Sequence, residues 1–202
     1  CHFYWTSMNL RKILYFIENL CIALTTFIAE IREQSAAIRA YDNVFQSRTC
    51  DNVFLQRSYD SIWRELISEI ARIFDKANTG SSENCTLYRL RNLCLREPYC
   101  ALFSNKEENN LIQSLDMVFE EYYQLPISYS RKKQLAHHDL KQVNAGDCIE
   151  ISLDQIESLI ANTTDIFSKI YTRFLGGFFE ISFPDYKILV EHFEKDIKKL
   201  DS

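Results

Sequence analysis

Residues 9–47 read NLRKILYFIENLCIALTTFIAEIREQSAAIRAYDNVFQS, a stretch without glycine or proline. Apolar residues recur in it at every seventh position, and a second apolar set stands between them. This spacing predicts one long helix with a single apolar stripe, because such positions share one helix face. The stripe is covered either by the rest of the same chain or, in addition, by a second copy. Its members are Leu10, Ile17, Leu24, Ile31, Ile38 and Phe45, with Ile13, Leu20, Phe27 and Tyr41 between them.

The rest of the chain continues the helical pattern. The whole sequence holds only four Gly and three Pro, which favours long helices over a many-stranded sheet. We therefore predict an all-α fold, an up-and-down helical bundle with a long N-terminal helix and additional flanking helices. Residues 178–183 are a short apolar run that is either a strand or an extended connector. Helices are expected near residues 53–74, 87–95, 105–124, 128–143, 152–175 and 184–200.

No low-complexity segment, internal repeat or linker divides the 202 residues. We therefore expect a single domain over residues 1–202. Within it, residues 1–50 form the long N-terminal helix and residues 52–175 form the core. Residues 176–202 form a C-terminal connector and helix.

Composition and charge narrow the class of protein. Hydrophobic residues make up 47% and charged residues 25%, as in ordinary globular proteins. A net charge of −5 argues against broad coating of nucleic acid, but it allows a local basic patch. Seven scattered Cys without a Cys-x-x-Cys pair indicate reduced thiols and a cytoplasmic protein. No apolar run reaches the ~20 residues that a membrane span needs, so no membrane partner is expected.

The densest basic stretch, residues 130–139, reads SRKKQLAHHD. Arg131 offers a planar set of donors that matches phosphate oxygens, and Lys132 and Lys133 add charge beside it. His137 and His138 carry imidazoles, which transfer protons near neutral pH. An arginine followed by histidines in this way is a minimal set for binding or cutting a phosphodiester. The alternative interpretation is a solvated helix face.

The geometry of one helix leaves the choice of histidine open. A six-residue step from Arg131 to His137 turns through about 600°, which leaves the two about 120° apart, whereas Arg131 and His138 nearly align. Gln134 shares the face of Arg131 and His138, and Lys133 shares that of His137. Either imidazole is therefore compatible with Arg131.

The pattern Arg-Lys-Lys-x-x-Ala-His-x-Asp at residues 131–139 resembles the signature of the HEPN superfamily of small helical domains. Within that superfamily it is most similar to the abortive-infection AbiU-type branch. A second block, residues 62–75, is similar to the upstream helix of this branch, where an Arg-Leu-hydrophobic-Asp ending recurs. Together the blocks touch residues 52–175. The residue after the Arg is usually Asn, Asp or His, whereas here it is Lys132.

The resemblance implies a HEPN-like core and a toxin or phage-defence ribonuclease that cleaves RNA without a metal, at an interface where two copies of the motif meet. It nominates Arg131 and His137 as catalytic residues, because the family's histidine follows the Ala, and His138 stays in reserve. Arg131 would stabilise charge on the transferring phosphoryl group. His137 would activate the ribose 2′-hydroxyl or protonate the leaving oxygen. Supporting or RNA-binding residues would be Lys132, Lys133, Gln134, His138 and Asp139.

The resemblance also implies partners and leaves alternatives. The implied partners are an RNA substrate, a second copy of the chain, and an antitoxin or a nucleotidyltransferase. Some relatives carry a Tyr two residues after the His that a partner enzyme modifies, but Asp139 stands there. One alternative is a non-catalytic HEPN domain that binds RNA or nucleotide, which Lys132 favours. The other is a helical interaction module that uses the heptads of residues 9–47.

Other charged and metal-ligating residues were weighed as sites. Arg89, Arg91 and Arg96 lie either on a solvated face or on an extension of a phosphate-binding surface. Arg72 and Asp75, three residues apart, are expected to form a structural pair. No metal or cofactor is expected, because the sequence has no glycine-rich phosphate loop, and the candidate zinc ligands lack a recognised spacing. Those ligands would be His137, His138 and Cys148.

Overall fold

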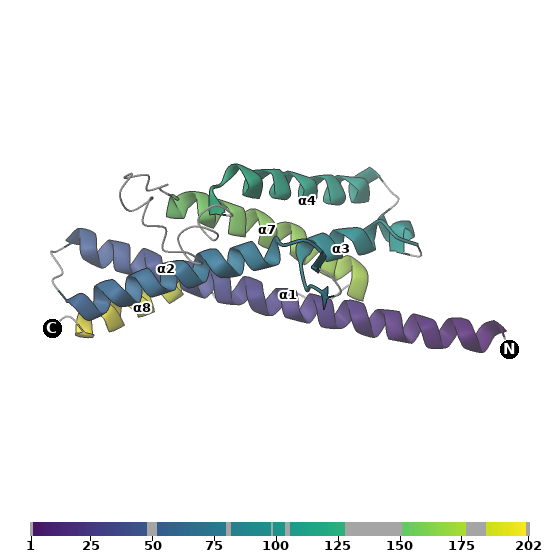
Figure 1. The fold of residues 1–202 in the computed structure, drawn as a ribbon, viewed down its shortest axis with the longest axis horizontal. Helices are drawn as coiled ribbons and strands as arrows, with labels where there is room; N and C mark the ends of the chain where they lie inside the picture. Colours follow the sequence, from purple (N-terminus) through teal and green to yellow (C-terminus); the bar gives the residue numbers. More distant parts are fainter. Residues whose placement is uncertain are drawn as a thin grey trace.

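The computed structural model describes residues 2–47, 52–79, 82–97, 99–103, 106–127, 151–176 and 185–200. These residues form an all-α helical bundle, as the sequence predicts (Figure 1). The long helices are α1 (His2–Ser47), α2 (Val53–Ile73), α4 (Lys106–Gln124), α7 (Leu153–Leu175) and α8 (Tyr186–Leu200). The shorter elements are α3 (Leu87–Cys94), the 3-10 helix η1 (Tyr99–Phe103) and the strands β1 (Asn78–Thr79) and β2 (Ser82–Glu83).

Helix α1 runs along the whole molecule. Its 46 residues span about 69 Å, and its N-terminal part projects beyond the other helices (Figure 1). Side chains are described for residues 15–46, and the predicted stripe is buried there: Ile17, Leu24, Ile31 and Ile38 are at most 1% exposed. Helices α2, α7 and α8 of the same chain pack against α1. The predicted helix is therefore confirmed, and within residues 15–46 the same chain covers the stripe.

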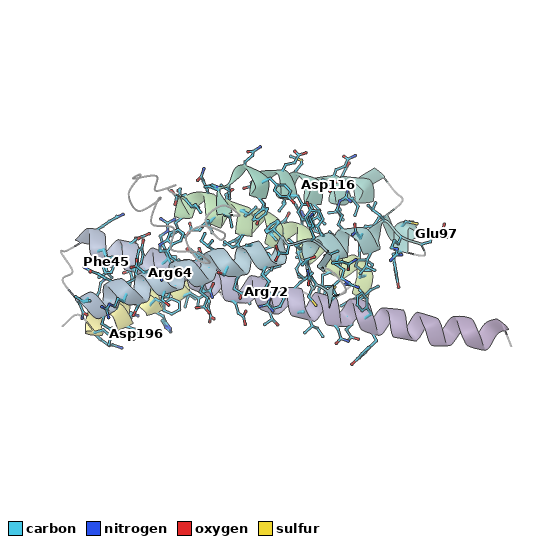
Figure 2. The ribbon with its side chains drawn as sticks, viewed as in Figure 1. Phe45, Arg64, Arg72, Glu97, Asp116 and Asp196 are labelled. Carbon is cyan, nitrogen blue, oxygen red and sulfur yellow. The ribbon has the colours of Figure 1, made fainter. Side chains whose placement is uncertain are left out.

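Buried side chains form two clusters. The larger cluster joins the middle of α1 to α2, α3, η1, α4 and α7. The smaller cluster lies where the C-terminal part of α1, the start of α2 and α8 meet. Figure 2 shows Phe45 of α1 and Asp196 of α8 at this same end of the molecule. The members of the smaller cluster are Ala36, Ala40, Tyr41, Val44, Leu55, Val190 and Ile197.

Local capping explains where several helices begin and end. The Asn52 side chain accepts hydrogen bonds from the N–H groups of Phe54 and Leu55, at 3.0 and 3.3 Å, which satisfies two donors at the start of α2. The Thr86 hydroxyl accepts one such hydrogen bond, from the N–H of Arg89 at 3.3 Å, at the start of α3. Ser152 precedes α7 as the sequence predicts, but its side chain makes no capping hydrogen bond. Gly176, with a φ of 76°, ends α7 in a backbone conformation that favours glycine.

Two other sequence expectations concern the C-terminal end of α2 and the segment that follows it. Between the helices expected near 53–74 and 87–95, β1 and β2 form a minimal antiparallel ladder in which Asn78 pairs with Glu83 and Thr79 with Ser82. Arg72, labelled on α2 in Figure 2, forms its ion pair with Glu69 at 3.3 Å and lies over the ring of Phe27. The pairing of Arg72 with Asp75 stays a prediction, and Glu69, one turn earlier on the same face, is the partner that the structure shows. The apolar run at 178–183 lies outside the described residues.

Candidate functional site

The residues nominated from sequence lie outside the described residues. Arg131, Lys132, Lys133, Gln134, His137, His138 and Asp139 all fall within 128–150, as does the helix expected at 128–143. The choice between His137 and His138 therefore stays a prediction. The described residues instead show what holds the two ends of this segment.

Both ends of the 128–150 segment are anchored in the larger cluster. Just after α4, Leu125 is 9% exposed and Ile127 is fully buried. Just before α7, Ile151 packs against the same cluster, and Leu153 is 7% exposed. The chain thus leaves and re-enters one hydrophobic core. The described residues on either side of the segment thus lie in the same core, where α4 stops and α7 starts.

Helices α4 and α7 pack directly against each other, and the groove between them is acidic. The Asn162 amide donates to the Glu121 carboxylate at 2.9 Å and ties the two helices together. Glu120 and Asp165 line the same groove. A surface with this charge repels a phosphate backbone. It therefore does not extend the basic stretch.

The start of α7 is held to α1 and α8 by a group of charged and phenolic side chains that we call the polar joint: Arg39, Asp154, Glu157 and Tyr186. The Arg39 guanidinium donates to both oxygens of Glu157, at 3.1 and 2.7 Å, and also to Asp154. The Tyr186 hydroxyl donates to the same Glu157 carboxylate. Two-point contact between arginine and a carboxylate is the strongest form of this pair. One carboxylate on α7 therefore connects all three helices.

The electrostatics of the polar joint indicate a structural role. The hydrogen bonds to Glu157 hold the pKa of Arg39 above its ordinary value, despite partial burial. Burial, followed by the hydrogen bond to Glu157, raises the pKa of Tyr186 to about 12, and the nearby Ser35 hydroxyl lowers it slightly. A phenol with this pKa stays protonated at neutral pH. The polar joint thus holds its charge state and is not poised for proton transfer.

Nearby Arg32 is a half-buried cation on α1. Desolvation lowers the pKa of its guanidinium, and the charges of Tyr186 and Asp185 partly oppose this shift. Arginine remains charged under such shifts. Arg32 thus brings a positive charge to the junction of α1, α7 and α8.

The two arginines of α3 contact side chains of neighbouring helices. Arg91 binds the Asp116 carboxylate of α4 through two nitrogens, one at 2.9 Å, and this contact raises the pKa of Arg91 (Asp116 is labelled in Figure 2). Arg89 is half-buried and lies 4.9 Å from the centre of the Phe16 ring of α1. Arg96 is exposed. The expectation of a solvated face is therefore wrong for Arg89 and Arg91, because both are engaged by neighbouring helices.

Sequence reasoning missed the polar joint. The available signal was Arg39 itself, a charged residue inside the run Ala36-Ala37-Ile38-Arg39-Ala40, in which the other four are buried. Small side chains allow a neighbouring helix to approach closely, and an arginine among them needs an acidic partner. Its partners lie more than a hundred positions away in the sequence, so the pattern alone cannot identify them.

Among the described residues, no group of three or more His, Cys, Asp or Glu is arranged to hold a metal ion. In the same part of the chain, no helix combines the length and apolar character that crossing a bilayer requires.

Comparison with known proteins gives one match. The family model of the HEPN type described as AbiU2 matches residues 9–200. This range includes both blocks singled out in the sequence, residues 62–75 and 131–139. No curated protein and no solved structure matches the chain.

Proposed function

Because the chain belongs to the AbiU2 family of HEPN domains, we propose that it is a metal-independent RNA endonuclease of a toxin or phage-defence type. In this proposal two copies form the active enzyme, and each contributes Arg131 and His137. The observation that carries it is the family match, which spans the Arg-Lys-Lys-x-x-Ala-His-x-Asp pattern in its expected order after the 62–75 block.

The chemistry assigns one role to each side chain. Arg131 neutralises the charge that develops on the phosphoryl oxygens, where a positioned donor has most effect. His137 moves the proton of the ribose 2′-hydroxyl or of the leaving oxygen. Lys132 and Lys133 bind neighbouring phosphates. Because the 2′-hydroxyl is the nucleophile, RNA is a substrate and DNA is not.

Two features of the described residues support this assignment. Ile127 and Ile151, which flank the segment that contains the motif, both lie in or against the larger cluster. The α4–α7 groove carries Glu120, Glu121 and Asp165, of which Asp165 is paired with Lys169, so its two remaining carboxylates disfavour phosphate binding there.

The test is RNA cleavage by the purified protein in the presence of EDTA. We expect cleavage of RNA and none of DNA. Arg131→Ala and His137→Ala should each reduce the rate at least a hundredfold, and His138→Ala should reduce it less, because general acid–base catalysis contributes about 10²–10⁴-fold. Matched controls are Arg64→Ala and His192→Ala, which change an exposed arginine and an exposed histidine on α2 and α8.

The outcomes separate the alternatives. Cleavage that persists in both Arg131→Ala and His137→Ala, or that EDTA abolishes, contradicts the proposal. RNA binding without cleavage, lost in the same variants, indicates the non-catalytic HEPN domain that Lys132 favours. The proposed dimer is checked by the mass of the protein in solution, measured by light scattering.

A further inference from the structure

We draw no further inference here: the strongest candidate, the exposed apolar patch that Tyr15 and Ile22 form on the outer face of α1, carries nothing, because no contact among the residues that the structure describes shows what covers it.

Discussion

In the larger cluster, α7 is held by apolar and aromatic packing: Phe174 meets the rings of Tyr99 and Phe103, with ring centres 5.8 and 5.3 Å apart. At the other end, α8 is attached to α1 and α2 by a smaller cluster and by directional contacts. Asn43 donates to Glu194 at 2.8 Å, and Asn52 donates to the carbonyl oxygen of Leu200 at 3.3 Å. Apolar packing tolerates small shifts, whereas hydrogen bonds require defined positions. Burial thus holds α7 in the larger cluster, whereas burial and hydrogen bonds together hold α8 in the smaller one.

The largest expected effect is the loss of a buried side chain. Ile170→Ala removes a fully buried side chain from the larger cluster, and we expect it to lower the free energy of unfolding by about 4 kcal/mol. Ile197→Ala, the matched change in the smaller cluster, should cost about 2 kcal/mol, since this cluster has fewer buried side chains. Urea unfolding of both variants provides the values. Equal losses would remove the contrast between the clusters.

The polar joint should contribute less than the larger cluster but more than a surface pair. Arg39→Ala leaves the half-buried Glu157 without its cation, and we expect a loss of about 2 kcal/mol. Lys169→Ala breaks the exposed pair with Asp165 and should cost about 0.5 kcal/mol or less. Adding Glu157→Gln to Arg39→Ala should recover part of the loss, as a double-mutant cycle measures. Additive effects would show that the two side chains do not interact.

Two positions before helices test whether stability depends on the capping hydrogen bond itself or only on the type of the capping residue. Asn52→Ala removes two capping hydrogen bonds at the start of α2 and should lower the free energy of unfolding by about 1 kcal/mol. Ser152→Ala changes a residue of equal capping preference whose side chain makes no such bond, so its effect should be close to zero. Chemical denaturation measures both. A loss of about 1 kcal/mol in Ser152→Ala would mean that Ser152 caps α7 in solution.

The smallest effect concerns Tyr186 at high pH. Tyr186→Phe removes one hydrogen bond and should cost about 0.5–1 kcal/mol at neutral pH. Since folding raises the pKa of Tyr186 from 10 to about 12, its contribution is complete below pH 10 and is lost as the pH rises toward 12. The difference in unfolding free energy between wild type and Tyr186→Phe should therefore be constant below pH 10 and shrink above it.

A second pH titration tests the larger cluster through its buried cysteine thiols. Burial raises the pKa of the Cys21 and Cys94 thiols from 9 to about 12, so their contribution begins to disappear one pH unit earlier, near pH 9. Alkylation followed by mass spectrometry checks their burial directly. Exposed Cys85 should react before buried Cys21 and Cys94, which should react only on unfolding. Fast alkylation of Cys21 at neutral pH would contradict the burial.

The two regions also differ in how far the sequence predicts them. The stripe of α1 follows directly from apolar spacing: Ile17, Leu24 and Ile31 were expected on one face and are buried together. The polar joint was not predicted, because Arg39 has many acidic residues available and only the packing angle of α1 against α7 selects Glu157. Arg91 was misassigned for the same reason. The roles of Arg131 and His137 rest on family resemblance and stay predictions, since spacing alone permits His138.

The continuity of α1 has a mechanical consequence. Its side chains enter the larger cluster as far as Ile38 and the smaller cluster from Ala36 onward, so the two overlap on one turn of an unbroken helix. Because α1 packs in both clusters, a rotation of this helix that improves packing in one cluster disturbs packing in the other. The molecule should accordingly melt in a single cooperative transition, with neither end able to loosen while the other stays intact.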